Sequence, residues 1–516
     1  MEIPDDRTHG DVAANWALVL ARTLRKPPRQ IAEELVGAVP RDDWFQGIEA
    51  AGPGFVNARL APGAVAAALS AVEAAGDAYG RQPSTGRSVL LEFISANPTG
   101  PLNVVSARAA AFGDALGNLL ERSGDKVWRE YYVNDAGAQI AALGASLAAR
   151  LLEMEGEPFA LPDNGYPGEY LKEIAARYRA SHGMEILAAP QAERDDALGR
   201  FALECLMEGV VRDLALYGIR FDRFFSERRD LREKGAVEAA IRDLDRRGVL
   251  KREDGALWLR TTMAGDDKDR VVVRSNGLPT YFAADIAYHR DKYERGFDTL
   301  IDVLGPDHHG YVDRMRAAVV ALGRDPASFE VKLVQWMRLL RDGEAVSMSK
   351  RGGEFIPMAD FLGEVGKDAA RFLFLLRSAD TPMDFDISLA RSEANENPVF
   401  YVQYAHARIS SILRQEGAGR GAGKPHLLTS PEEMALVRSI LAFPEELVMA
   451  ARLREPHHIA RFALLLARDF HAFYNRHRVL GVEEDLSKAR LRLVAAVGQV
   501  LRLALGILGV GAPESM

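Results

Sequence analysis

The chain has 516 residues, 48% of them hydrophobic, with 65 lysines and arginines against 73 aspartates and glutamates, a net charge of −8. This length predicts about three or four domains with sizeable cores, and it excludes a disulfide-stapled mini-domain and a disordered tail. Taken for the whole chain, the acidic balance argues against a nucleic-acid partner. A single cysteine, Cys205, excludes an internal disulfide and every multi-cysteine zinc site, and it fits a reducing compartment.

The two most informative segments for localisation are the N-terminal residues and the apolar C-terminal stretch. The start, MEIPDDRTHGDVA, is acidic and polar, so we expect no secretory leader. Residues 493–512 are apolar but carry Gln499 and Arg502 near their middle, which favours a buried amphipathic helix over a membrane span. We therefore expect a cytoplasmic protein without membrane contact.

The first part of the chain mixes helical and strand patterns. Helical periodicity covers residues 13–24 and 31–36, a strand pattern covers 54–60, and an alanine-rich helix pattern covers 62–75. The following RQPSTGR has the composition of a linker. These signals predict a small α+β domain over residues 1–84.

The middle of the chain has the pattern of an α/β fold. The run SVLLEFI at 88–94 predicts a strand, and after a Gly/Pro turn comes a predicted helix at 107–122. A second strand pattern and a mostly helical section follow, and strand patterns then return at 256–262, 270–274 and 299–304. The alternation predicts a Rossmann-like domain at 85–389, with a parallel sheet interrupted by a helical insertion at about 150–230.

From residue 390 to the end the pattern is almost entirely helical, apart from a flexible loop at 417–426. This predicts an all-α domain over 390–516.

A strand, a turn and a helix also form the first chemically informative segment, EFISANPTGPLNVVSARAAAFGD at 92–114. The strand ends at Asn97 and Pro98, and the chain turns through Gly100 into the helix. Backbone N–H groups at a helix start favour a phosphate. By spacing alone, an ordinary strand-to-helix turn is favoured over a phosphate site as the explanation of this segment.

The segment RSNGLPTYFAADIAYH at 274–289 combines aromatic and acidic residues. Tyr281 and Asp285 are four residues apart, and Tyr288 is seven from Tyr281, so on a helix they share a face. A carboxylate beside an aromatic ring suits a guanidinium group. Core packing would explain Tyr281 equally well, but a buried Asp285 requires a partner.

Two further segments are ambiguous by themselves. LGPDHHGYVDRM contains adjacent His308 and His309, but neighbours in sequence rarely point the same way and no third ligand lies at helical spacing, so we expect no metal site. In VSMSKRGGEFIP at 346–357, the basic residues alone are typical of a solvated loop.

Together these segments resemble the arginyl-tRNA synthetase family of class I aminoacyl-tRNA synthetases. The family's "HIGH" motif, ANPTGPLHVGHAR, corresponds to residues 96–108, where Asn103 and Ser106 replace the two histidines and Val105 replaces glycine. The family's histidines donate hydrogen bonds to ATP phosphates, and Asn103 and Ser106 still offer donors. The change is compatible with a working variant motif or with a decayed site.

The segment at 346–357 resembles the family's second nucleotide motif, "KMSKS", with Ser347 in place of the first lysine. The resemblance implies that Lys350 meets the leaving pyrophosphate, and that Asn103, Ser106 and Lys350 are the catalytic residues. It implies Mg²⁺ bridging the phosphates, and ATP contacts from Pro98, Thr99, Gly100, Asp307, His308, Met348, Ser349 and Lys350.

The resemblance also assigns an arginine pocket. It implies that Tyr281 and Asp285 hold the arginine side chain, and that Glu92 and Asn97 bind its amino and carboxylate ends. The matching segment YYVNDAGAQI places Asn134 and Asp135 along the same cleft.

Divided by region, the charge no longer argues against RNA. Residues 391–516 carry a net charge of +3, and they hold six of the eleven histidines. Aromatic residues alternate there with arginines, as unstacked RNA bases prefer, although amphipathic helices with solvated arginines would look the same. NENPVFYVQYAHARISSIL resembles the family's anticodon-binding domain, which implies tRNA contacts from Tyr401, Arg408, Phe473, Tyr474 and Arg476. The N-terminal segment, including THGDVAANWALVLA, resembles the domain that touches the outer corner of tRNA.

The resemblance spans nearly the whole chain. It implies an arginine–tRNA ligase, expected to be a monomer, that forms arginyl-adenylate from L-arginine and ATP and transfers arginine to the 3′ end of tRNA. Two alternatives remain: a non-catalytic or weakly catalytic paralogue that binds tRNA, and a class I synthetase for another amino acid.

Overall fold

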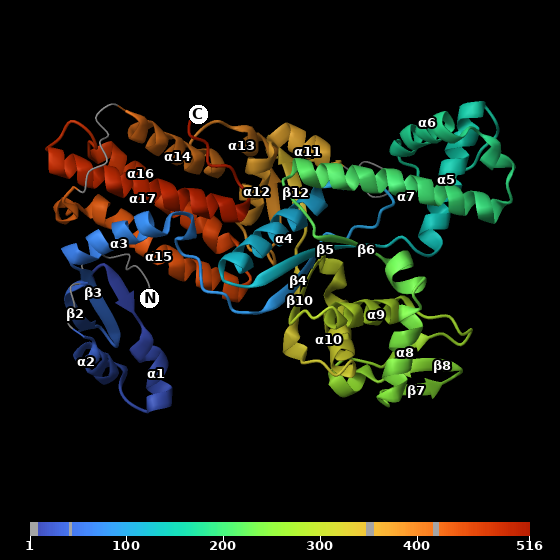
Figure 1. Cartoon of the computed structure of the whole chain (residues 1–516), viewed down its shortest axis with the longest axis horizontal. Coiled ribbons are helices and arrows are strands. Elements are labelled where there is room, and N and C mark those ends of the chain that lie inside the picture. Colours follow the sequence, from blue (N-terminus) through green and yellow to red (C-terminus); the bar gives the residue numbers. More distant parts are fainter. Residues whose placement is uncertain (1–8, 41–43, 347–355, 416–422) are drawn as a thin grey trace. The chain divides into compact units, whose positions relative to one another are not determined.

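We analysed a computed structural model, which describes residues 9–40, 44–346, 356–415 and 423–516. The chain divides into two compact units (Figure 1). One contains Pro83–Ser392 with Arg454–Pro456, and the other contains Met1–Gln82, Glu393–Leu453 and His457–Met516. Each unit is described by itself.

The first unit is built on a five-stranded parallel sheet in the order β11-β10-β4-β5-β6. Its strands are β4 (Ser88–Phe93), β5 (Lys126–Val133), β6 (Arg223–Ser226), β10 (Thr299–Leu304) and β11 (Phe329–Leu333). The strand order reverses between β4 and β10, and ligands of open parallel sheets bind beyond the carboxyl ends of the strands at such a point. The predicted Rossmann-like sheet is confirmed.

Between β5 and β6 the chain forms the predicted helical insertion. Its helices are α5 (Ala138–Glu155), α6 (Tyr170–His182) and α7 (Gln191–Leu216), with a core of their own (Figure 1). Helices α5 and α7 pack closely because two glycines face the partner backbone. A Cβ atom on Gly144 would lie 1.7 Å from the Asp195 carbonyl oxygen, so no other residue fits there.

The strands expected at 256–262 and 270–274 do not join the parallel sheet. They form a separate antiparallel sheet of β7 (Leu250–Glu253), β8 (Ala256–Leu259) and β9 (Arg270–Val273). The prediction was wrong because Asp254 and Gly255, both with positive φ, make a two-residue hairpin turn between β7 and β8. This sheet packs with α8 (Ala236–Arg246), α9 (Tyr281–Glu294) and α10 (Val312–Ala321) around one core.

The rest of this unit surrounds the first helix after β4. Strand β12 (Met337–Arg341) pairs with β13 (Glu344–Ala345) and with β14 (Met383–Asp386). The helices here are α4 (Val104–Arg122), α11 (Met358–Val365), α12 (Lys367–Leu375) and α13 (Ile387–Arg391). Arg108 of α4 is buried, and its guanidinium donates to the carbonyl oxygens of Gln335, Trp336, Ser378 and Thr381. This one side chain therefore joins α4 to the loops around β12 and β14.

The second unit combines the two ends of the chain. Its N-terminal part has a sheet in the order β1-β3-β2, of β1 (Val12–Ala14), β2 (Phe45–Ala51) and β3 (Phe55–Leu60), with α1 (Trp16–Leu24), α2 (Pro28–Ala38) and α3 (Pro62–Ala75). The short β1 falls where we expected the first helix to begin. A three-residue strand shows no period, and it is held by pairing with β3, far along the chain.

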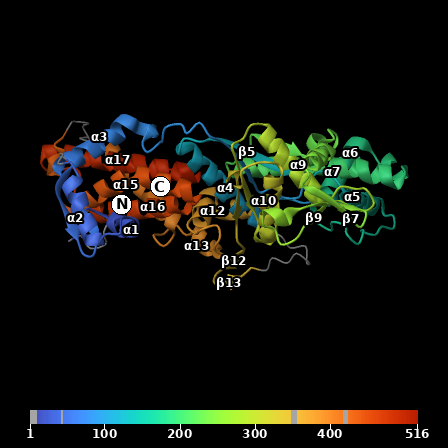
Figure 2. The same cartoon turned by 90° about the horizontal axis from the view of Figure 1, so that it is seen from below.

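The C-terminal part of this unit is all helical, as predicted. Its helices are α14 (Pro398–Arg414), α15 (Pro431–Leu453), α16 (His457–Arg476) and α17 (Glu484–Leu508). Figures 1 and 2 show α15, α16 and α17 running side by side. Among the described residues, α17 is the one helix long and apolar enough to cross a membrane, but 72% of its most apolar window is buried, so it serves as a core helix. The predicted fold class is thus confirmed.

Candidate active site

A buried ion network lies at the carboxyl ends of β4 and β10, where the strand order reverses. Glu92 and Asp302 lie opposite each other in the strand register. Both are buried, with 7% of Glu92 and 2% of Asp302 exposed. Lys292 of α9, which is fully buried, lies between them, with its Nζ 2.6 Å from Glu92 Oε2 and 2.9 Å from Asp302 Oδ1. His289 of the same helix lies 2.9 Å from the other oxygen of Asp302. The network thus places the carboxylates of Glu92 and Asp302 beside the side chains of Lys292 and His289.

The backbone is strained where β4 ends. Ile94 and Ser95 have φ values of 68° and 39°, in the region that side chains other than glycine rarely adopt. Such conformations cost of order 1–3 kcal/mol each and persist where the surrounding structure enforces them. Here the turn lets Ser95 Oγ donate to Glu92 Oε1 at 2.8 Å and accept from the Tyr132 backbone N–H at 3.0 Å. The strain therefore serves to orient Glu92.

Beside this network lies an acidic pocket. It is formed by Asp285 of α9 and by Glu227, the first residue of the short helix η4 (Glu227–Arg232). The charges of both carboxylates act on the Tyr132 hydroxyl, and that of Asp285 also acts on the Tyr311 hydroxyl. Burial raises the pKa of Asp285 to about 7, opposed by His289 and reinforced by Glu227, Glu92 and Asp302. Burial also raises the pKa of Tyr132, whose hydroxyl donates to Glu227. Several carboxylates this close together favour an organic cation as ligand.

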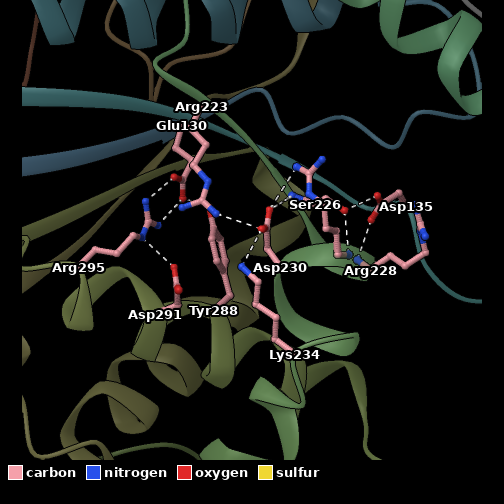
Figure 3. Close-up of polar contacts among 11 residues, drawn as sticks. Glu130, Asp135, Arg223, Ser226, Arg228, Asp230, Lys234, Tyr288, Asp291 and Arg295 are labelled. Atoms are coloured by element: carbon pink, nitrogen blue, oxygen red, sulfur yellow. Dashed lines mark hydrogen bonds and ion pairs between the residues drawn. The ribbon is translucent and has the colours of Figure 1, made fainter.

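Glu227 is held in the pocket by the turn into η4, shown in Figure 3. Asp135 accepts from Ser226 Oγ at 2.5 Å and from the Arg228 backbone N–H at 2.8 Å. Asp230 accepts from the Ser226 backbone N–H at 3.0 Å and pairs with Arg223 and Lys234. Asp135, which we expected along the cleft, therefore orients this turn. The sequence analysis missed Glu227, although an acid at the carboxyl end of a parallel strand was a usable signal.

Three residues of α9 were predicted to share the face that binds a guanidinium group, and one of them does not. Tyr281, at the start of the helix, is 61% exposed and lies one turn before Asp285. Tyr288, predicted on the same face, instead points into the core, where its hydroxyl donates to Glu130 at 2.8 Å (Figure 3). Glu130 also pairs with Arg295. Tyr288 thus belongs to the structural network beneath the pocket.

The start of α4 contains the other group of predicted residues. Asn103 is the N-cap, and its Oδ1 accepts from the backbone N–H groups of Val105 and Ser106 at 3.0 and 3.1 Å. Ser106 Oγ also donates to this oxygen at 3.4 Å. The capping oxygen leaves the Asn103 amide nitrogen as the donor for a ligand. The structure thus brings Asn103 and Ser106 together at a helix start.

The turn before α4 is packed against the helical insertion. Pro98 is buried, the Thr99 carbonyl accepts from the Tyr170 hydroxyl of α6, and a Cβ on Gly100 would lie 3.6 Å from the Tyr170 ring. Asn97 is exposed, and its Oδ1 accepts from Asn134 Nδ2 at 3.2 Å. These residues line the turn that joins β4 to α4.

Residues 347–355, which contain Met348, Ser349 and Lys350, lie outside the described part of the chain. The residues that follow them are hydrogen-bonded to the first motif. Val104 N donates to the Ile356 carbonyl at 3.2 Å, and Met358 N donates to the Leu102 carbonyl at 2.8 Å. The end of the second motif is therefore attached to the start of α4.

Asp307 and His308 follow β10 in the helical turn η6 (Pro306–Tyr311), and both are exposed. The His308 ring meets the Tyr311 ring edge-on, with centroids 6.0 Å apart. Since Tyr311 faces Asp285, η6 connects the acidic pocket to these two residues. His309 is exposed beside them.

In the other unit, four of the five predicted tRNA residues have side chains at or near the surface. The Arg408 guanidinium lies between the rings of Tyr404 and Tyr474, 4.6 and 4.5 Å from their centroids. The Tyr401 ring packs on His471, and Arg476 pairs with Glu432. Phe473 is fully buried in the bundle, so its ring cannot stack on a base, and its assignment to tRNA is corrected. The error arose because the helix face of Phe473 depends on how α16 packs.

The fold and the paired motifs at the β4 and β10 ends define the catalytic domain of a class I aminoacyl-tRNA synthetase. A methionyl-tRNA synthetase from Mycobacterium tuberculosis shares the fold, with a TM-score of 0.56 and 13% identity over 83% of this chain and 91% of that one. The family described as "tRNA synthetases class I (R), catalytic domain" matches residues 68–380. Such a domain uses ATP.

Two further families match the ends of the chain: "Arginyl tRNA synthetase N terminal domain" over residues 1–60 and "DALR anticodon binding domain" over 402–516. The chain is 48% identical to the arginine–tRNA ligase of Desulforudis audaxviator and 47% identical to that of Symbiobacterium thermophilum, over 100% of this chain and 93% and 94% of theirs. Thermus thermophilus arginyl-tRNA synthetase superposes with a TM-score of 0.79 at 25% identity, over 100% of this chain and 96% of that one. The chain belongs to the arginyl-tRNA synthetase family.

Proposed function

We propose that this chain is an arginine–tRNA ligase, which activates L-arginine with ATP and transfers the arginyl group to the 3′ end of tRNA. The observation that carries the proposal is the grouping of the Asp285 and Glu227 carboxylates near Glu92, at the carboxyl ends of the sheet strands. Two carboxylates can take the fork of a guanidinium group, and the Tyr281 ring at the mouth offers a face for it.

The proposed chemistry is mainly positioning and charge stabilisation. With the guanidinium at Asp285 and the α-ammonium at Glu92, the substrate carboxylate lies toward Asn97 and the turn before α4. Its oxygen attacks the α-phosphorus of ATP, the bond to the β-phosphate oxygen breaks, and pyrophosphate leaves. The terminal ribose hydroxyl of tRNA then displaces AMP from the arginyl carbonyl and releases one proton.

We assign the phosphates to the helix start and to the second motif. Asn103 and Ser106 offer neutral donors there, next to the backbone N–H groups of α4, and Lys350 is proposed to neutralise the leaving pyrophosphate. Mg²⁺ fits this arrangement, because it binds phosphates with few protein carboxylates, and Asp307 is exposed at the end of β10. When bound, it would neutralise phosphate charge, and Pro98, Thr99, Gly100, His308, Met348 and Ser349 stay predicted ATP contacts.

For tRNA, we propose contacts from four residues of the helical region: Tyr401, Arg408, Tyr474 and Arg476. Residues 391–516 have a positive net charge, whereas that of the whole chain is negative. Arg408, already stacked between two tyrosine rings, has the geometry that suits unpaired bases. The burial of α17 supports a protein without a membrane span, and the single cysteine supports a cytoplasmic location. A monomer remains our expectation.

Two alternatives are disfavoured. A non-catalytic paralogue has no need of the buried carboxylates, the strained turn at Ile94 and Ser95 or the capped helix start, yet all are present. A synthetase for a neutral amino acid would leave Asp285 without a cationic ligand.

The proposed function is tested by ATP–pyrophosphate exchange on the purified chain, with arginine and its tRNA. We expect exchange that depends on both, and none with a neutral amino acid in place of arginine. Absence of exchange with cognate tRNA present would favour the non-catalytic alternative.

Arginine use is expected to depend on pH through Asp285. Its pKa in the free protein is about 7, and the ionised carboxylate is the form that pairs with a guanidinium. Consequently kcat/KM for arginine should fall about tenfold for each pH unit below 7 and level off above it. The measurement is the exchange rate at subsaturating arginine from pH 5.5 to 8.5. A profile unchanged in Asp285→Asn would contradict the assignment.

Asn103 is expected to have two separable roles, as helix cap and as phosphate donor. Asn103→Asp keeps a good cap but replaces the amide donor with a carboxylate, so we expect little change in the denaturation midpoint. The exchange rate at saturating substrates should fall by a factor of about 10² or more, because a donor is lost and a charge repels the phosphate. If Asn103→Asp exchanges at the wild-type rate, Asn103 only caps the helix.

A further inference from the structure

Lys292 is a buried cation that none of the proposed binding roles uses. It lies on α9, two turns after Asp285, and 0% of it is exposed, so a ligand in the pocket does not reach its ammonium group. Burial alone would lower the pKa of Lys292, but Asp302 and Glu92 outweigh burial and raise it. The Lys292 ammonium is therefore a buried positive charge. It also lies over the Tyr288 ring, 4.2 Å from the ring centroid.

The contacts of Lys292 divide unequally between its two carboxylates. Asp302 accepts from Lys292 through Oδ1 and lies against His289 through Oδ2, at 2.9 Å each. Among the described residues, Glu92 has Lys292 as its one cationic partner, at the shorter distance of 2.6 Å, and a hydroxyl donor, Ser95, on its other oxygen. Without Lys292, Asp302 keeps His289 as a partner, whereas Glu92 keeps only the neutral Ser95 hydroxyl.

The strand register indicates how the removal of Lys292 would affect Glu92 and Asp302. Glu92 and Asp302 are register partners on adjacent parallel strands, so their side chains lie next to each other on one face of the sheet. Two carboxylates at this spacing repel, and one of them takes up a proton or moves away. With Lys292 in place, the two carboxylates share one cation, and Glu92 is held by hydrogen bonds to both of its oxygens.

We infer that Lys292 is a positioning residue for the amino acid substrate: its buried ammonium holds the Glu92 carboxylate in place, aimed at the site of the substrate α-ammonium group. This inference rests on the proposed function, since it concerns the amino end of the same arginine site. Lys292 acts through Glu92 and touches no reacting atom. The Glu92 carboxylate is thereby already in position at one end of the pocket before any substrate is bound.

The test compares KM values for arginine with protein stability in three variants. Lys292→Met should raise KM for arginine by up to about a hundredfold, with a smaller effect on kcat and none on KM for ATP. It should also lower the denaturation midpoint, because two adjacent carboxylates lose their shared cation. The double variant Lys292→Met with Asp302→Asn removes this repulsion. Its midpoint should recover, while KM for arginine stays high, because Glu92 still lacks its donor.

The matched control is Arg295→Met. Arg295 is the C-cap of the same helix, and it pairs with the buried Glu130, at 2.7 Å from each oxygen (Figure 3). We expect a lowered midpoint and an unchanged KM for arginine. If Lys292→Met does not fold, the double variant carries the comparison with Arg295→Met.

Two outcomes would overturn the positioning role. One is that KM for arginine recovers together with the midpoint in the double variant, because Lys292 would then only balance Asp302. The other is that Arg295→Met raises KM as much as Lys292→Met, because the effect would then reflect loosening of α9. Failure of the proposed function is recognised separately, since the wild-type chain would then show no arginine-dependent exchange at all.

Discussion

Asp285→Asn is expected to reduce kcat/KM for arginine by roughly two to three orders of magnitude, because it leaves an enclosed guanidinium without its charged partner. The amide has the same shape and keeps one acceptor oxygen, so the loss reports charge and not size. The measurement is arginine-dependent ATP–pyrophosphate exchange, with KM for ATP followed in parallel and expected to stay unchanged.

The same substitution is expected to stabilise the protein at high pH. The pKa of Asp285 is about 7 in the folded protein and close to 4 when unfolded, so the unfolded chain binds fewer protons between these values. Ionised Asp285 therefore destabilises the fold progressively as pH rises above 4, and Asn removes this penalty. Asp285→Asn should raise the denaturation midpoint at pH 8 and leave it nearly unchanged at pH 4.

Asp291→Asn is the matched control for the arginine kinetics. Asp291 lies on the same helix but pairs with Arg295 at 2.7 Å, away from the pocket. It should leave KM for arginine unaltered. An equal loss of arginine affinity in the two variants would show that the pocket is misplaced.

Lys350→Ala is expected to have the other large effect, a fall of about 10²–10³ in the rate of exchange at saturating substrates. The loss follows from the proposed role, because removing one group that stabilises developing charge typically has an effect of this size. KM for arginine should change little, and tRNA binding should be nearly unaffected, since tRNA contacts are proposed for α14 and α16. Filter binding of labelled tRNA together with exchange kinetics separates the two.

Lys367→Ala provides the comparison for Lys350→Ala. Lys367 is an exposed lysine at the start of α12. Its removal should leave exchange at the wild-type rate, which excludes a general dependence on surface charge. Should Lys350→Ala retain full activity, the second motif would have no part in pyrophosphate release.

The sequence was most informative where the signal is local. The apolar run at 88–94, its Asn-Pro turn and the helix after it are short-range patterns, and the structure has β4 and α4 there. The four-residue spacing of Tyr281 and Asp285 was read as one face of a helix, and both residues lie on α9. The capping role of Asn103 was also readable in principle, since asparagine is a preferred N-cap.

What the sequence could not supply depends on pairing between distant segments. Glu92 and Asp302 meet because β4 and β10 are neighbours in the sheet, and no local pattern encodes that register. Without this register, the sequence does not distinguish Lys292 from other charged residues of a helix, or Glu227 from those of a charged loop. Phe473 was misassigned for the same reason, because its burial depends on the neighbouring helices.

The support of the pocket carboxylates limits how the amino acid preference of such an enzyme can be changed. Two of these carboxylates come from different elements, and each has a cation beside it: Lys292 for Glu92 and Arg232 for Glu227, at 2.6 Å each. A neutral substitution of Glu92 or Glu227, aimed at accepting an uncharged substrate, would remove one carboxylate partner from Lys292 or Arg232. We expect that redesign for a neutral amino acid requires paired replacements, one acid together with one base, and that single changes only weaken arginine binding.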